Sequence, residues 1–98
     1  MQTGAGRAGS FFSHGWSGVE GDLLTCAKGI ASGFPVGAVL TRGDLATRLA
    51  PGDLGSTFGG GPVAMAACAA TSRVIEEEDL AGNACRMKTV LREGLSAF

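Results

Sequence analysis

The chain has 98 residues, of which 45% are hydrophobic and 17% charged, and this balance predicts a globular rather than a disordered protein. Its formal net charge of -1 gives no electrostatic reason to expect nucleic acid or an anionic membrane as a partner. Three cysteines without a CxxC pair and a single histidine make a structural metal site unexpected. Free thiols and the lack of a visible signal peptide favour a cytoplasmic protein without a membrane anchor.

Glycine is unusually frequent, with 17 residues where the average share of about 7% would give less than half as many. The glycines cluster, first at Gly4, Gly6 and Gly9 and again over residues 55–61. Clustered glycine indicates sharp turns or backbone pressed close to another group. A flexible linker is the alternative, but hydrophobic runs separate the clusters and favour a site.

The first half of the chain predicts a loop, one helical turn and two strands. Residues 1–10 are a glycine-rich loop, and the aromatic stretch 11–16 is long enough for one turn of helix. Residues 22–27 and 35–41 are short apolar runs with turn residues on both sides. Such runs are typical of buried strands.

The second half predicts three helices. Asp44 is expected to cap a short helix that ends before Pro51. Pro62 marks the start of a helix over residues 62–77, which has almost no polar face before Arg73 and is expected to be buried. Asp79 is expected to cap the last helix. That helix has one apolar face without a visible partner, formed by Leu80, Ala84, Met87, Leu91 and Leu95.

The alternation of strands and helices indicates an α/β fold. Two apolar strands cannot form a stable parallel sheet by themselves. We therefore expect the chain to be an internal piece of a larger α/β domain.

Gly4, Gly6 and Gly9 match the pattern G-x-G-x-x-G, which binds dinucleotides when a strand precedes it and a helix follows it. Only three residues precede Gly4, and Gly15 interrupts the segment that follows. The match is weak, and it leaves a nucleotide-binding oxidoreductase open as an alternative.

The second glycine cluster combines Ser56 and Thr57 with open backbone just before the helix that starts at Pro62. Unpaired N–H groups and the positive end of the helix dipole favour an anion at such a place. The alternative is an ordinary capped helix start with a flexible lead-in. A P-loop is disfavoured because its Gly-Lys-Ser/Thr is missing.

Lys28 directly follows the predicted strand 22–27. A lysine at the carboxyl end of a central strand points into the crevice where α/β proteins bind ligands, and its amine can form an imine there. The alternative is a solvated surface lysine at a strand end.

Four segments together resemble, in order and spacing, the class III aminotransferases that depend on pyridoxal 5'-phosphate, the acetylornithine and ornithine aminotransferase-like enzymes. They are residues 2–9, 22–29, 34–38 and 55–60, and a weaker match follows at 74–81. The resemblance covers essentially the whole chain. It implies part of the large domain of the fold type I transferases over residues 1–78, and a helix at the start of the C-terminal domain over residues 79–98.

The resemblance also implies roles for single residues. Lys28 matches the lysine that holds the cofactor as a Schiff base and moves the substrate proton. Gln2 matches the glutamine that hydrogen-bonds the phenolic oxygen of the cofactor. Thr57, with Ser56 beside it, matches the threonine that reaches the cofactor phosphate of the neighbouring subunit in a homodimer. Arg7 matches a frequent arginine of the glycine loop, for which only a structural role is expected.

The implied reaction moves an amino group from a donor such as acetylornithine to 2-oxoglutarate. Aminomutases and decarboxylases share the lysine segment and remain open, as does a chain that only binds a partner through its last helix. Leu54 stands where many members have histidine, and Gly61 where many have asparagine, which leaves the subfamily open. The aspartate that usually precedes the glutamine and pairs with the pyridinium nitrogen is not in this sequence.

Overall fold

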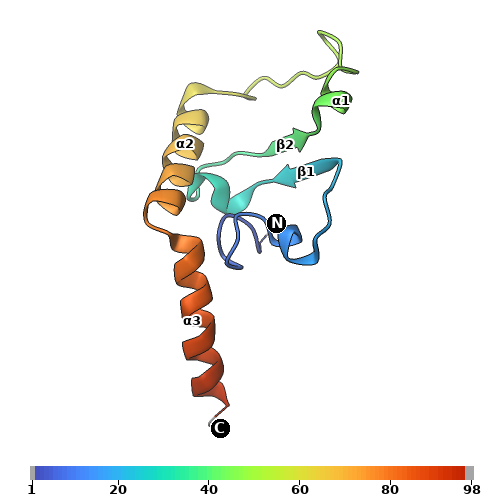
Figure 1. The fold of residues 1–98 in the computed structure, drawn as a ribbon. Helices are drawn as coiled ribbons and strands as arrows, with labels where there is room; N and C mark the ends of the chain where they lie inside the picture. Colours follow the sequence, from blue (N-terminus) through green and yellow to red (C-terminus); the bar gives the residue numbers. More distant parts are fainter. Residues whose placement is uncertain (1, 97–98) are drawn as a thin grey trace.

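The computed structural model describes residues 2–96. Figure 1 shows α2 and α3 following one another along one side of the molecule, with the two strands and the N-terminal glycine loop beside α2. A long connection over residues 47–61 arches from α1 back to the start of α2. The elements in chain order are η1 Ser13–Ser17, β1 Leu23–Cys26, η2 Lys28–Ala31, β2 Ala38–Thr41, α1 Gly43–Ala46, α2 Pro62–Glu77 and α3 Leu80–Leu95.

The two strands pair antiparallel, with Leu23 opposite Thr41 and Cys26 opposite Ala38. A parallel pair needs a crossover of about a dozen residues or more, usually containing a helix. The connection over residues 27–37 contains only the single turn η2, so the chain returns directly alongside β1. The expected strands are therefore present, but they form a hairpin rather than part of a parallel array.

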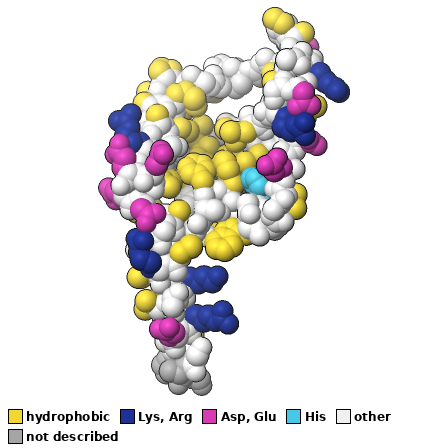
Figure 2. Space-filling view, viewed as in Figure 1, with side chains coloured by type: hydrophobic (Ala, Val, Ile, Leu, Met, Phe, Trp, Pro, Cys, Tyr) yellow, Lys and Arg dark blue, Asp and Glu magenta, His cyan; other side chains and the backbone are white. Residues whose placement is uncertain are grey.

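The prediction that both strands are buried is wrong for this chain. Leu23 is 62% exposed and Val39 65%, and only Cys26 at the end of β1 is buried. Period-two patterning reports which face of a strand is apolar, whereas burial depends on what covers that face. Figure 2 shows hydrophobic side chains gathered in the hollow between α2 and the two strands, open to solvent.

The buried hydrophobic core of the described residues is small and lies around the turn after β1. It consists of Cys26 from β1, Ala31 from η2 and Ile75 from α2. Gly6 of the N-terminal loop is buried against the same side of α2. The buried side chains of residues 2–96 therefore lie around the segment that contains Lys28.

Helix α2 begins at Pro62, as its sequence predicts, but the prediction that it is buried is wrong. Val63 is 64% exposed, and Ile75 is the one buried residue of the helix. The helix contacts η2 and α3. In its alanine-rich part, Ala64 and Ala67 are half-buried, whereas Ala66, Ala69 and Ala70 are exposed.

Helix α1 is capped differently from the expectation. Its N-cap is Arg42 and not Asp44, which lies inside the first turn. The Arg42 guanidinium donates to the Asp44 carboxylate at 3.2 Å and to the Asp22 carboxylate at 3.1 Å. The Asp44 carboxylate thus pairs with Arg42 instead of capping the helix. Because Arg42 also pairs with Asp22, it links α1 to the residue that precedes β1. The helix ends at Ala46, before Pro51, as predicted.

The N-cap expected for helix α3 is confirmed. Asp79 is its N-cap, and the Asp79 carboxylate accepts hydrogen bonds from the Gly82 N–H at 3.1 Å and from Arg86 at 2.9 Å. These bonds lower the pKa of the Asp79 carboxyl. The apolar face that includes Leu91 and Leu95 stays uncovered within residues 2–96, with Leu95 73% exposed. None of the helices described is long and apolar enough to cross a membrane.

Candidate functional site

Lys28 occupies an uncommon backbone conformation at the end of β1. Ala27 is still extended, and Lys28 then turns into the left-handed region with φ +60° as the first residue of η2. A side chain other than glycine costs roughly 1–2 kcal/mol there, so the surrounding structure must maintain it. Cys26 and Ala31, both buried, fix the chain on either side of the turn.

Lys28 lines an open pocket of about 660 Å³, within the range of pockets that hold small molecules and cofactors. The lysine amine, a guanidinium and a hydroxyl supply its polar groups, while a phenylalanine, a proline and a valine form the apolar wall. The residues are Arg7, Lys28, Gly29, Ser32, Gly33, Phe34, Pro35 and Val36. An exposed amine beside an apolar wall fits a flat, aldehyde-bearing cofactor, and this arrangement makes the pocket the candidate active site.

The first glycine cluster does not form a nucleotide site. A Cβ atom at Gly6 would lie 3.3 Å from Ile75 Cγ2, and one at Gly9 would collide with Cys85 Sγ. These glycines therefore let the loop pack against α2 and α3, and no helix of α type follows the loop. The alternative of a dinucleotide-binding motif is wrong, because the backbone that should face a pyrophosphate faces protein.

Gln2 lies at the start of this loop, exposed and outside the set of residues that line the Lys28 pocket. Ser56 and Thr57 lie on the connection between α1 and α2, also exposed and outside that set. Within one chain, the structure therefore does not bring Lys28 together with the other three candidate residues. It brings Lys28 together with Arg7, to which the sequence assigns only a structural role.

The second glycine cluster forms a tight turn before α2. A Cβ atom at Gly59 would lie 2.8 Å from the Ser56 Cβ atom, and Gly60 has φ +71°. No side chain caps the start of α2, so its first backbone N–H groups remain available to a ligand. This geometry suits the predicted anion site, with Ser56 and Thr57 just ahead of it.

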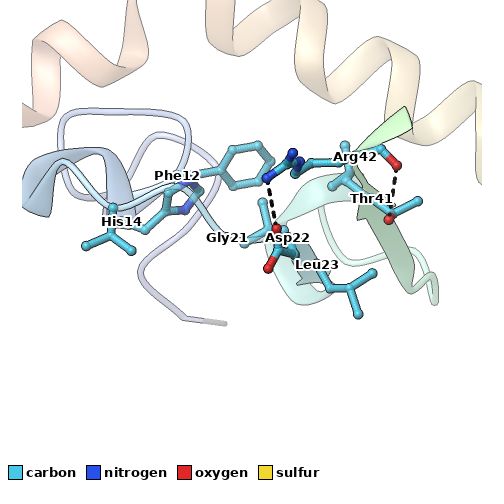
Figure 3. Close-up of a pocket in the computed structure, with 10 residues that line it drawn as sticks. Phe12, His14, Gly21, Asp22, Leu23, Thr41 and Arg42 are labelled. Atoms are coloured by element: carbon cyan, nitrogen blue, oxygen red, sulfur yellow. Dashed lines mark hydrogen bonds and ion pairs between the residues drawn. The ribbon is translucent and has the colours of Figure 1, made fainter. Parts of the chain in front are cut away.

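A second pocket lies at the opposite end of β1. Figure 3 shows Phe12, His14 and Arg42 around it, with the Arg42 guanidinium directed at Asp22. Both partners of that ion pair are mostly solvent-exposed, and such pairs contribute little stability. The two opposite charges satisfy one another, and the His14 ring stacks on Phe12 with 5.8 Å between ring centroids.

The cysteines and acidic residues form no further centre. The three cysteines are free, and burial raises the pKa of the Cys26 thiol, which disfavours the reactive thiolate. Within residues 2–96, no three side chains of the metal-binding types lie close enough together to hold an ion.

Comparison with known proteins adds to this picture. The family model described as aminotransferase class-III matches residues 1–98. The chain is 45% identical over 97 residues to acetylornithine aminotransferase 1 of Bordetella pertussis, a match that covers 99% of this chain and 25% of the relative. The chain thus spans about a quarter of the length of this curated relative.

Two solved structures contain the same arrangement of elements. The acetylornithine aminotransferase of Elizabethkingia anophelis superposes with a TM-score of 0.90 at 33% identity, over 98% of this chain and 24% of that one. An ornithine aminotransferase of Toxoplasma gondii, with partial occupancy of PLP at its active site, gives 0.88 at 37% identity, over 96% and 22%. The sequence match and these two folds agree, and the chain belongs to the class-III aminotransferase family.

Proposed function

We propose that this chain supplies the cofactor-binding lysine of a pyridoxal-phosphate-dependent transaminase that moves an amino group from acetylornithine or a related donor to 2-oxoglutarate. The observation that carries the proposal is Lys28, held in a left-handed turn at the mouth of an open pocket. The relatives named acetylornithine aminotransferase support the choice of donor.

Pyridoxal 5'-phosphate, when bound, supplies the electron-withdrawing ring that acidifies the substrate Cα–H bond. Lys28 would hold the cofactor through its side-chain amine, and the same amine would carry the proton away from and back to the substrate. Gln2 would donate a hydrogen bond to the cofactor's phenolic oxygen. Phe34 and Pro35 form an apolar wall beside the lysine, and this wall is open to solvent within residues 2–96, with Phe34 41% exposed.

Ser56 and Thr57 bind the cofactor phosphate of a second copy in a homodimer. Within one chain they lie outside the Lys28 pocket, on the connection that arches away from it. Phe58, next to Thr57, is 89% exposed, as expected for a segment that packs against another subunit. The open N–H groups at the start of α2 complete the anion site.

The division at residues 78 and 79 belongs to the same proposal. The large domain ends with α2, and α3 leads into the C-terminal domain, with the left-handed Asp79 as the break between them. The hydrophobic hollow between α2 and the strands is then covered by the rest of the large domain. The free cysteines are compatible with the reducing cytoplasm.

The test is product analysis with a protein of full family length that contains this segment. Incubated with acetylornithine, 2-oxoglutarate and the cofactor, it is expected to form glutamate and the corresponding aldehyde in equal amounts. Release of carbon dioxide, or an isomerised amine without consumption of 2-oxoglutarate, would instead establish a decarboxylase or an aminomutase.

A further inference from the structure

Arg7 lies against the residue that immediately follows Lys28. Its Nη2 and Nε atoms are 3.8 Å and 3.9 Å from the position of a Cβ atom at Gly29, and the guanidinium lines the same pocket as the lysine. These two nitrogens, together with the Ala5 Cβ atom at 3.8 Å, are the atoms that a side chain at position 29 would meet first. Arg7 is thus the one cationic side chain besides Lys28 that lines this pocket.

The backbone that carries Arg7 is firmly anchored. The N–H groups of Ala5 and Gly6 both donate to the Phe11 carbonyl, at 2.9 Å and 3.4 Å. Gly6 is buried, and a Cβ atom there would lie 3.3 Å from Cγ2 of Ile75, a member of the small core. The residue before Arg7 is thus held by both hydrogen bonding and packing.

The Arg7 charge has no ion-pair partner within residues 2–96. The ion pairs of that region involve Arg42 with Asp22 and Asp44, and Arg86 with Asp79. A salt bridge therefore does not explain why a long planar cation lies on η2. Besides the Lys28 pocket, Arg7 lines a second pocket with Ala84, Met87 and Leu91 of α3, so the side chain lies close to both η2 and α3.

We infer that Arg7 is a positioning residue for Lys28: its guanidinium, which lines the same pocket next to Gly29, holds the left-handed turn so that the lysine amine enters the pocket. The inference rests on the proposed role of Lys28. Preorganisation of a reacting amine matters because misplacement by about 1 Å can cost a hundredfold in rate.

The experiment compares Arg7→Lys and Arg7→Met in a protein of full family length freed of cofactor. Arg7→Lys keeps the positive charge but loses the planar guanidinium. Arg7→Met keeps an unbranched side chain but loses both the charge and the planar group. Both variants are expected to slow covalent capture of added pyridoxal 5'-phosphate at Lys28, trapped with borohydride, by roughly ten- to a hundredfold. Arg73→Met removes an exposed arginine from α2 outside the pocket and is expected to capture at the normal rate.

Gly29→Val tests the same arrangement by changing Gly29 and leaving Arg7 unaltered. The Cβ atom of valine would lie 3.8 Å from Arg7 Nη2, so its two methyl branches are expected to displace the guanidinium. The Gly29→Val and Arg7→Met effects are expected to be non-additive in the double variant, because both remove one contact. Additive effects on the rate of cofactor capture would mean that the two substitutions act through separate causes. That result would contradict the inference.

Steady-state kinetics separate positioning from direct substrate binding. Positioning lowers kcat and leaves the KM for the amino donor nearly unchanged. A raised KM with normal kcat would show that Arg7 binds the substrate carboxylate, and normal capture in Arg7→Lys would show that charge alone matters. Either result overturns the inference. Absence of capture at Lys28 in the unmodified protein would instead overturn the proposed function.

Discussion

At the scale of the single residue, Lys28 combines a reactive side chain with an unfavourable backbone. Its φ of +60° lies in the region that glycine adopts freely and other residues avoid. Backbone strain of this kind persists where the surrounding structure enforces it, often at functional sites. The small core around Cys26, Ala31 and Ile75 provides that enforcement here.

Lys28→Gly and Lys28→Ala both remove the amine, and both should abolish covalent cofactor binding and turnover. They differ in backbone strain, because alanine keeps the Cβ atom that glycine lacks. We expect the glycine variant to be more stable than the alanine variant by about 1 kcal/mol. Chemical unfolding of the cofactor-free proteins measures the difference. Equal stability, or a more stable alanine variant, would contradict the left-handed conformation.

Thr57 offers a second test at the residue scale. Removing one hydrogen bond to the charged phosphate should cost on the order of 1.5–3 kcal/mol, or roughly ten- to a hundredfold in cofactor affinity. We therefore expect Thr57→Ala to raise the Kd for pyridoxal 5'-phosphate by that factor. Fluorescence titration of the cofactor-free dimer measures it, with Thr47→Ala on the same connection as the control.

A mixed dimer decides which subunit the threonine serves. When a Thr57→Ala subunit pairs with a Lys28→Ala subunit, only one site retains its lysine. If the threonine acts across the interface, that site receives an intact Thr57 from its partner and binds the cofactor with near-normal affinity. Affinity as weak as in the Thr57→Ala homodimer would assign the threonine to its own subunit.

At the scale of the elements, the glycine loop is held by close approach to α3. Gly9 has φ +83°, and a Cβ atom there would collide with Cys85 Sγ beside the Trp16 ring. Gly9→Ala should therefore destabilise the protein by about 1–3 kcal/mol, through backbone strain and overpacking together. Gly52→Ala isolates the strain, because Gly52 has φ +99° and no atom within 4 Å of the added methyl group.

The steric part of this prediction has its own control. Cys85→Ala removes the sulfur that the new methyl group meets, so the Gly9→Ala/Cys85→Ala pair should recover part of the loss. Thermal unfolding of the single and double variants measures the coupling between the two positions. Simple additivity would show that the loop does not pack on α3 as described.

The helices were predictable from sequence because their ends carry local signals. Pro62 marks the start of α2 because proline lacks the N–H group that would stay unpaired in the first turn. Asp79 marks the start of α3 because its carboxylate accepts a hydrogen bond from a backbone N–H of the first turn. Burial was not predictable in the same way, because it depends on neighbours distant in sequence. The contact between Arg7 and Gly29 is equally non-local, and no spacing in the sequence indicates it.

The antiparallel pairing of the two strands follows from sequence, because the short connection between them excludes a crossover. Lys28 lines a pocket, and its role as the cofactor-binding residue stays a prediction. The roles of Gln2, Ser56 and Thr57 stay predictions, because in one chain none of them lines that pocket.

At the scale of the whole molecule, the 98-residue chain has a very small core. Within residues 2–96, three hydrophobic side chains are buried, whereas many large ones on α2, α3 and the strands are exposed. A domain so poorly covered is marginal in stability, and a two-stranded sheet adds little. We expect the isolated chain to unfold with weak cooperativity and to show no transamination. Measurable transamination by the purified 98-residue chain would contradict this prediction.

The central claim is that Lys28 binds the cofactor covalently, and one measurement tests it directly. A protein of full family length containing this segment is loaded with pyridoxal 5'-phosphate, reduced with borohydride, digested and mapped by mass spectrometry. We predict that the phosphopyridoxyl group lies on Lys28 in stoichiometric amount, while Lys88, the other lysine of this chain, stays unmodified. Modification at Lys88, or at any lysine other than Lys28, would contradict the account.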